Sequence, residues 1–265
     1  MRVGIGSAVV LGFFGVIPAA QGITGLEIMQ ERERRHERSY EESWVSMHLY
    51  DKRGKKKEER LMVTYSRQSG RLDRRLMKFA NPADIRGVGL LTWEQPAGRE
   101  DDQWLYLPAS KKVKRIAGSG KKNQFMGTDL AYEDLRPENL SAHDYQLVGE
   151  TKVDGHKCWM IVATPKTAKE KRDSGYSKRT MYTRQDVYFT IKTEYYGKRG
   201  RLEKVGILQK VVPVAGRAYR ANLAVMQRMK KGTKTIIVHR RRTLDKKLDE
   251  SLFTQQGLSR PVTSR

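Results

Sequence analysis

Short segments in which apolar and polar residues alternate recur along most of this chain. The first half contains ESWVSMHLYD (42–51), EERLMVTYSRQ (58–68), RRLMKFA (74–80), GVGLLTWEQ (87–95) and QWLYLPA (103–109). Alternation of this kind, rich in aromatic and β-branched residues, is typical of strands with one face buried. Gly, Pro, Asn or a basic cluster separates neighbouring segments. The pattern therefore predicts antiparallel strands joined by tight turns.

The second half repeats the pattern around three further turns. The turn at 153–156 (VDGH) carries an Asp-Gly pair between two alternating runs, which is a strong hairpin signal. Residues 197–200 (GKRG) and 230–233 (KKGT) lie between the later strands in the same way. Together the two halves predict about ten antiparallel strands.

Helical spacing occurs near the two ends of this strand region. Residues 23–38 place apolar side chains at positions 23, 26 and 29, which predicts an amphipathic helix. The closing segment spaces Leu244, Leu248 and Leu252 as a helix does, with Phe253 beside them and Gly257 placed to cap its end. The expected fold is mainly β (α+β), a single curved antiparallel sheet that forms an incomplete barrel covered by helices. A sheet that wraps this far encloses an apolar cavity.

The first 22 residues differ from the rest of the chain. Arg2 precedes an apolar run over 3–17, and small residues follow it. This order is typical of a secretory signal peptide, and residues 20–22 (AQG) fit the small residues of a cleavage site. We expect residues 1–22 to be removed and residues 23–265 to form one domain in the periplasm. A membrane anchor is the alternative, but the run is short for a bilayer and contains glycines.

The chain is strongly basic, with 53 Lys and Arg against 30 Asp and Glu and a net charge of +23. Such a charge points to anionic partners, either a lipid surface or nucleic acid. The basic residues are spread along almost the whole chain, whereas a nucleic-acid footprint is normally concentrated on one element. We therefore expect no nucleic-acid partner, and a polyanion-binding role stays open as an alternative.

No combination of residues predicts an active site or a bound cofactor. GSGKK (118–122) lacks the spacing of a phosphate-binding loop, since Arg115 stands where the first glycine belongs. The five histidines are scattered and show no metal-ligand spacing. Asp129, Glu133 and Asp134 are better explained by a short helix whose N-terminus attracts acidic side chains. The prediction is a protein that is not an enzyme and binds no cofactor and no metal.

Aromatic side chains on the predicted strands indicate what the sheet encloses. Alternation puts Trp104 and Tyr106 on one face of their strand and Leu105 and Leu107 on the other. Because both faces are apolar, one must meet helices or a second layer, and the other a packed core or a ligand. The residues predicted to line a lipid cavity are Met47, Leu49, Val63, Tyr65, Phe79, Trp93, Trp104, Tyr106, Phe125 and Phe189. Those predicted to contact a head group or a membrane are Lys111, Lys112, Lys114, Arg115, Lys121 and Lys122.

A series of segments resembles the outer membrane lipoprotein-sorting protein family, relatives of the periplasmic carrier LolA and its receptor LolB. WLYLPASKKVKRI followed by FMGTDLAYEDL is similar to the family's signature. The other matching segments are MKFANPADIRGVGLLTWE, VDGHKCWMIVATPK, IKTEYYGKRGRLEKV and LDESLFTQQGL. The resemblance covers nearly the whole chain, and the segments occur in the expected order.

The resemblance implies an incomplete antiparallel barrel whose open side is crossed by helices that act as a plug or lid. It implies a periplasmic carrier that holds acyl chains of a lipid or lipoprotein and delivers them between membranes. A large permease of the resistance–nodulation–division type, or an anionic membrane surface, is the implied partner. The one cysteine of the chain, Cys158, lies far from the apolar run, so the lipid-modified cysteine that directly follows such a run in an anchored lipoprotein is absent.

In this interpretation, Asp129 to Leu135 form a short helix across the cavity, capped by Thr128 or Asp129. The lid is expected to be held by few contacts, because a carrier must release its cargo. The alternative is an accessory protein that docks on a membrane transporter and whose interior is only a packed core.

Overall fold

The computed structural model describes residues 22–69, 72–96 and 98–262. The predicted signal peptide, residues 1–22, lies outside the described residues apart from Gly22. Among the described residues, no helix combines the length and the apolar composition needed to cross a bilayer.

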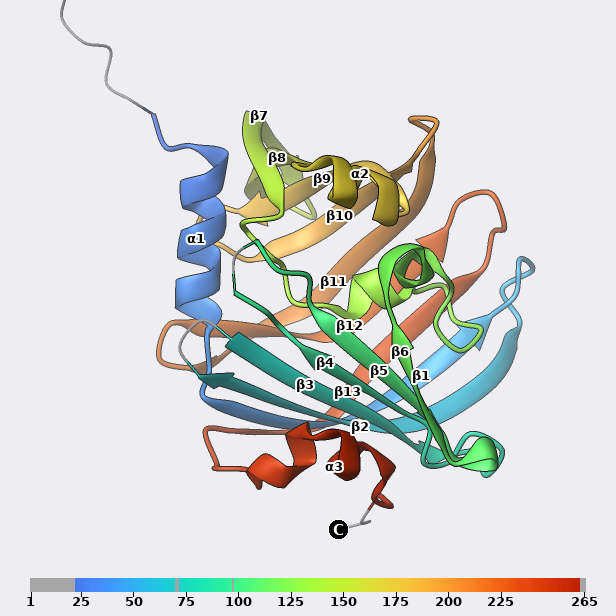
Figure 1. The fold of residues 1–265 in the computed structure, drawn as a ribbon. Coiled ribbons are helices and arrows are strands. Elements are labelled where there is room, and N and C mark those ends of the chain that lie inside the picture. Colours follow the sequence, from blue (N-terminus) through green and yellow to red (C-terminus); the bar gives the residue numbers. More distant parts are fainter. Residues whose placement is uncertain (1–21, 70–71, 97, 263–265) are drawn as a thin grey trace, which may run out of the picture.

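Thirteen strands form one antiparallel sheet in the described chain (Figure 1). Except for β6 and β7, strands that are neighbours in sequence pair with one another, and β1 pairs with β13 in the middle of the sheet. The edges of the sheet are β6 and β7, which are consecutive in the chain. The prediction of a single, unclosed antiparallel sheet is confirmed. The strands are β1 (Tyr40–Tyr50), β2 (Lys56–Ser69), β3 (Leu72–Asn81), β4 (Gly89–Trp93), β5 (Asp102–Leu107), β6 (Lys112–Ile116), β7 (His143–Val153), β8 (His156–Pro165), β9 (Tyr176–Arg184), β10 (Thr190–Gly197), β11 (Leu202–Ala215), β12 (Ala218–Arg228) and β13 (Lys234–Leu244).

The hairpin between β7 and β8 illustrates how the turn residues set the register. Only Asp154 and Gly155 separate the two strands, and Val153 pairs with His156. Both turn residues have positive φ, 50° for Asp154 and 78° for Gly155, which a two-residue type I′ turn requires. The turns predicted at 197–200 and 230–233 also join consecutive strands, so these three hairpins are confirmed.

The basic stretch 111–122 is more ordered than the predicted loop. Residues Lys112–Ile116 form the edge strand β6, which pairs with β5, and Gly118–Lys122 form the 3-10 helix η2. The first four residues of β6 are exposed and only Ile116 is buried. A short edge strand that carries lysines is a common way to keep a sheet edge from pairing with other chains. The lysines and glycines of 111–122 predict a basic turn and loop over this whole stretch, and for Lys112–Ile116 that prediction is wrong.

The N-terminal helix α1 (Gly25–His36) confirms the helix predicted in this region. Thr24 and Glu27 form a capping box, in which the Thr24 hydroxyl accepts the Glu27 N–H at 3.2 Å. The buried face carries Ile28 and Met29, while Leu26 is 40% exposed, so the apolar spacing chosen from the sequence is offset from the buried one. These two side chains pack on the inner face of β8 and β9.

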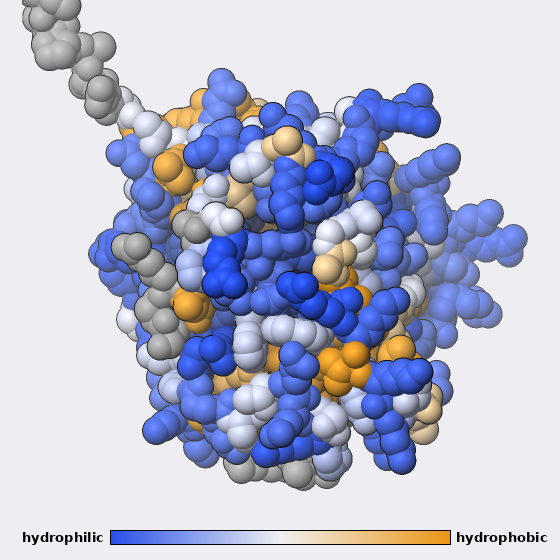
Figure 2. Space-filling model, in the orientation of Figure 1, coloured by the Kyte–Doolittle hydropathy of each residue, from blue (hydrophilic) through white to orange (hydrophobic). Residues whose placement is uncertain are grey.

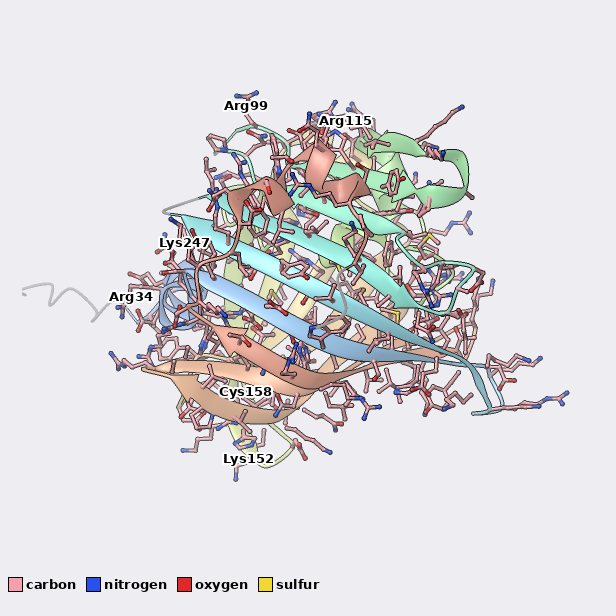
Figure 3. All side chains as sticks on the ribbon, turned by 90° about the horizontal axis from the view of Figure 1, so that it is seen from below. Arg34, Arg99, Arg115, Lys152, Cys158 and Lys247 are labelled. Carbon is pink, nitrogen blue, oxygen red and sulfur yellow. The ribbon has the colours of Figure 1, made fainter. Side chains whose placement is uncertain are left out.

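The C-terminal segment covers the part of the convex face that β3, β4 and β5 form (Figure 3). Here the long helix predicted after Leu244 is replaced by the 3-10 helix η4 (Glu250–Phe253) and the short helix α3 (Gln255–Ser259). Gly257 lies inside α3, so it is not the cap of a helix. Glycine is needed there because a Cβ at this position would collide with the carbonyl oxygen of Ser251. The close approach lets Phe253 and Leu258 bury completely against β3, β4 and β5.

Candidate functional site

A single segment, residues 117–142, joins the two edges of the sheet and crosses its concave face (Figure 1). The helix predicted over Asp129–Leu135 is present only as the 3-10 helix η3 (Tyr132–Leu135). Its cap also differs from the prediction, because the Asp134 carboxylate accepts the Ala131 N–H at 2.6 Å. We call residues 117–142 the crossing segment.

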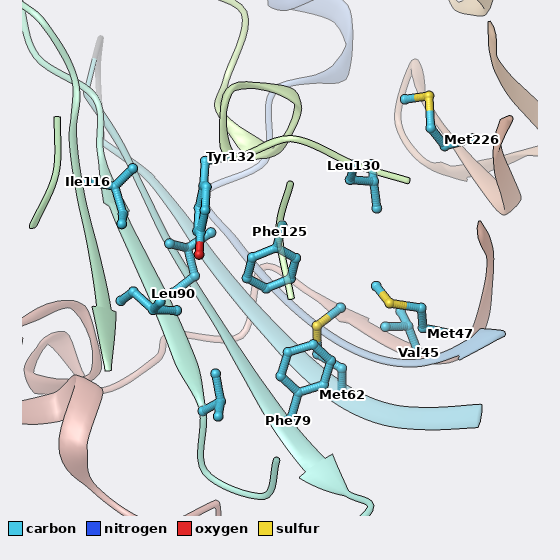
Figure 4. Packing of buried hydrophobic residues seen from close by; sticks show 12 residues of the cluster. Val45, Met47, Met62, Phe79, Leu90, Ile116, Phe125, Leu130, Tyr132 and Met226 are labelled. Atoms are coloured by element: carbon cyan, nitrogen blue, oxygen red, sulfur yellow. The ribbon is translucent and has the colours of Figure 1, made fainter. Parts of the chain in front are cut away.

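The crossing segment fills one half of the concave face (Figure 4). Phe125 stacks on Phe79 of β3 with ring centroids 5.8 Å apart, and Tyr132 meets Phe125 edge-on at 5.5 Å. Leu130 completes the same cluster together with residues of β1, β2, β4 and β5. The half of the sheet formed by β1–β6 therefore encloses a packed core rather than open space.

The other half of the concave face keeps a cavity of about 640 Å³ between the crossing segment, α1, the short helix α2 (Ala168–Asp173) and β9–β13, and it extends to residues of β1, β2 and β3. Strand pairing places Leu208, Ala224 and Ile237 in one row across its floor, and Gly206 and Met226 in the next. Apolar side chains from the crossing segment, Leu130 and Leu140, also line it. The volume lies within the range of about 300–1,000 Å³ that is usual for small-molecule sites.

Charged groups border this apolar floor in large numbers. They come from α1, α2, β1, β3, β9, β10, β12, the crossing segment and the loop between β4 and β5: Arg32, Glu33, Glu41, Asp73, Arg75, Glu100, Lys121, Glu133, Asp134, Arg136, Glu138, Glu170, Asp173, Arg179, Lys192 and Arg220. Figure 2 shows the corresponding face of the molecule as mainly hydrophilic, with apolar side chains exposed in small areas between charged ones. The cavity is thus amphipathic, apolar along its floor and charged around it.

Buried ion pairs hold the crossing segment to the sheet. Lys204 of β11 pairs with Asp134, and their side chains are 4% and 1% exposed. The Glu138 carboxylate accepts two hydrogen bonds from Arg179 of β9, at 2.7 and 2.8 Å, and one from the Tyr145 hydroxyl. Arg136 pairs with the fully buried side chain of Asp101. The expectation of a lid held by few contacts was therefore wrong for this segment.

The ion pair between Glu138 and Arg179 also shifts the pKa values of the buried groups beside it. Burial by itself would raise the pKa of Glu138, but the Arg179 guanidinium outweighs it and lowers that pKa to about 2. Burial and the Glu138 charge raise the pKa of Tyr145 above its usual range. The carboxylate therefore stays ionised and the tyrosine stays a donor at any pH near neutrality.

Histidines around the cavity should make the folded state sensitive to acid. Burial lowers the pKa of His36, His143 and His239 to about 4. The unfolded chain binds more protons than the folded one between about pH 6.5 and 4, so stability falls as pH drops through that window. Burial raises the pKa of Glu94 to about 7, which offsets part of this loss. We expect urea unfolding to give a free energy at least about 2 kcal/mol lower at pH 4.5 than at pH 7. Equal values at the two pH values would contradict this assignment.

The residues predicted to line a cavity fall into four groups. Met47, Phe79 and Phe125 belong to the packed concave cluster, and Leu49 packs against it. Phe189 and Tyr65 border the cavity. A third set, to which Tyr65 also belongs, lies on or against the convex side, where Trp104 is part of the cluster under the C-terminal helices and the others pack against it: Tyr65, Trp93 and Tyr106. Val63 is fully buried on β2 and belongs to neither cluster.

The basic residues predicted to contact a head group or a membrane differ in their exposure. Most are exposed on β6 or beside it: Lys111, Lys112, Lys114, Arg115 and Lys122. Lys121 is only 3% exposed, pairs with Glu100 at 2.5 Å and donates to the Asp101 carbonyl oxygen. Its burial means that it cannot contact a membrane surface. Figure 3 shows basic side chains, such as Arg34, Arg99 and Lys152, projecting from several sides of the molecule.

Sequence reasoning missed the residues that form the floor of the cavity. Met181, Leu208, Ala224, Met226 and Ile237 lie on the later strands, where alternation was recognised but no face was assigned. Among the described residues, no group of three or more His, Cys, Asp and Glu side chains could hold a metal ion.

Several known proteins share this arrangement. A family model described as an uncharacterized protein matches residues 71–260. An outer membrane lipoprotein-sorting protein domain from Vibrio parahaemolyticus is 29% identical with a TM-score of 0.83, over 89% of this chain and 98% of its own. A DUF1329 family protein from Desulfovibrio piger is 28% identical with a TM-score of 0.82, over 88% and 97%. A LolA superfamily protein from Nitrosomonas europaea shares the fold at 18% identity and a TM-score of 0.68, over 89% and 100%. No curated protein matches the chain.

Proposed function

Because the chain belongs to the outer membrane lipoprotein-sorting protein family of the LolA/LolB-like superfamily, we propose that it is a periplasmic lipid carrier. In this proposal, residues 1–22 direct export and residues 23–265 form the carrier domain. The carrier holds acyl chains of a lipid or lipoprotein and delivers them between membranes. A large permease of the resistance–nodulation–division type is its proposed partner.

The cavity over β9–β13 is the observation that carries this proposal. Its floor of Leu208, Ala224, Met226 and Ile237 offers apolar contact to a hydrocarbon chain. Each buried methylene contributes about 0.8 kcal/mol, so a chain of about fourteen carbons contributes roughly 10 kcal/mol. The costs of association reduce this sum. The remaining binding free energy allows the ligand to bind and still to dissociate.

The basic surface supports a second part of the proposal, contact with an anionic membrane. Lys111, Lys112 and Lys114 are exposed on and beside the edge strand β6. Each lysine near an anionic lipid surface contributes about 1 kcal/mol of attraction. The carrier would thus be drawn to the membrane where it collects or releases cargo.

A second candidate function rests on the packed half of the concave face. Phe79, Phe125 and Tyr132 fill the space over β1–β6 with the protein's own side chains. An accessory protein that docks on a membrane transporter needs no ligand cavity. In that case the space over β9–β13 would hold only water.

Blocking the floor of the cavity distinguishes the two candidates. Ala224→Trp places a large side chain on the inner face of β12, and Leu223→Trp places it on the outer face as a control. We expect delipidated wild-type protein to bind a fluorescent fatty acid saturably, and Ala224→Trp to weaken binding at least about tenfold. Leu223→Trp should bind as the wild type does. Binding that is absent in the wild type, or unchanged in Ala224→Trp, argues for the accessory protein.

A further inference from the structure

Arg32 lines the cavity from helix α1. It lies on α1 in line with Ile28 and His36, which share one face of the helix at a spacing of four residues. Ile28 is fully buried against β8 and β9. His36 is fixed by the carbonyl oxygens of Val187 and Tyr188, at 3.1 and 3.2 Å from its Nε2. Anchors on both sides therefore hold Arg32, which is half-buried, against the cavity.

Arg32 differs from the other cations of the cavity wall because it lacks a partner. Among the described residues, it makes no hydrogen bond and no ion pair within 4.0 Å. Every other lysine or arginine that lines the cavity pairs with a carboxylate: Arg75 with Asp73, Lys121 with Glu100, Arg136 with Asp101, Arg179 with Glu138, Lys192 with Glu194, and Arg220 with Glu41. A cation taken out of water without a partner is costly.

The charges nearest to Arg32 do not offset this cost. Burial lowers the pKa of Arg32, and Arg75 adds repulsion. Glu138 attracts Arg32, but its carboxylate already accepts hydrogen bonds from Arg179 and Tyr145. Glu33 also attracts Arg32, but as the next residue of the helix it does not face Arg32 and forms no ion pair with it within 4.0 Å. A group that brings its own negative charge into the cavity would supply the missing partner.

We propose that Arg32 binds the anionic head group of the cargo, and that the cargo is an amphiphile whose head is a carboxylate or a phosphate. This inference rests on the proposed carrier function. The planar guanidinium matches both kinds of head group, since it can donate two parallel hydrogen bonds to either. Helix α1 stands at one end of the strands (Figure 1), while the apolar floor extends over β11–β13. The head group lies at α1 and the tail along Met226 and Ile237.

The test compares two ligands of the same chain length, one with a carboxylate and one with an uncharged hydroxyl head group, on residues 23–265 of the wild type, Arg32→Gln and Arg34→Gln. Arg34 is the matched control, because it lies on the same helix, is 66% exposed and pairs with Glu31. Hexadecanoic acid and hexadecanol displace a fluorescent reporter at pH 8. We expect the wild type and Arg34→Gln to prefer the acid by about tenfold to a hundredfold, and Arg32→Gln to lose that preference. Binding of the alcohol should be the same in all three proteins.

Other outcomes separate the possible failures. If the wild type binds neither ligand, the carrier function itself is rejected. If it binds both ligands equally, or if Arg32→Gln keeps the preference for the acid, the head-group site is rejected and the carrier stands. Displacement of the reporter by inorganic phosphate alone would mean that the site takes a free anion rather than a lipid head group. Urea unfolding should show Arg32→Gln to be at least as stable as the wild type, since an unpaired charge is removed.

Discussion

Replacing Lys204 by methionine is expected to destabilise the folded protein by about 3–5 kcal/mol. Lys204 is 3% exposed, and its ammonium group pairs with Asp134 in the crossing segment. Without it, a carboxylate that is 1% exposed loses its counter-charge and keeps only hydrogen bonds from the Tyr176 hydroxyl and the Ala131 N–H. Urea unfolding at pH 7 measures the loss.

Two further variants make this test specific. Lys157→Met removes an exposed lysine from β8 and should change stability by less than about 0.5 kcal/mol. The double variant Lys204→Met with Asp134→Asn removes both charges and should recover part of the loss, since no unpaired charge remains. A loss below about 1 kcal/mol for Lys204→Met alone would show that the pair does not hold the crossing segment to the sheet.

Replacing Phe253 by alanine is expected to cost about 3–5 kcal/mol, the usual range for a fully buried phenylalanine. Phe253 is 0% exposed and packs with Leu76, Leu91 and Trp104 on the convex face. The Trp93 indole N–H also donates to the Phe253 carbonyl oxygen at 2.8 Å. Loss of the ring should loosen η4 and α3 and expose these tryptophans, which a red shift of their fluorescence would report.

Met229→Ala is the control for Phe253→Ala. Met229 is 46% exposed, so its truncation should change stability by less than about 0.5 kcal/mol. If Phe253→Ala is as stable as Met229→Ala, the C-terminal segment is a loosely attached tail. The convex face would then be available for other contacts, contrary to the packing described here.

The strands and hairpins could be predicted from the sequence because their signals are local. Alternation marks a strand, and the Asp154-Gly155 pair alone specifies its turn. The strand at Lys112–Ile116 escaped detection, since four of its five residues face solvent and it lies at a sheet edge. The pairing of β1 with β13 joins residues from opposite ends of the chain, and no local signal specifies such a contact.

The site was harder to predict than the fold. Alternation separates Trp104 from Leu105, but it does not say which of the two faces is concave. The C-terminal segment settles that by covering the side of Trp104, a contact between residues about 150 positions apart. Arg32 was missed because residues 31–38 read as a solvated, charged end of a helix. Only the burial of Ile28 and the anchoring of His36 turn this side chain toward the cavity.

The central claim is that the space over β9–β13 holds a hydrocarbon chain. Native mass spectrometry of the protein, produced from its full sequence and purified without detergent, tests this claim most directly. We expect the wild-type protein to carry one lipid of low mass with an anionic head group, and the Ala224→Trp variant to carry none. A wild-type protein whose mass equals that of its chain alone, and which takes up no fatty acid when one is added, would contradict the claim.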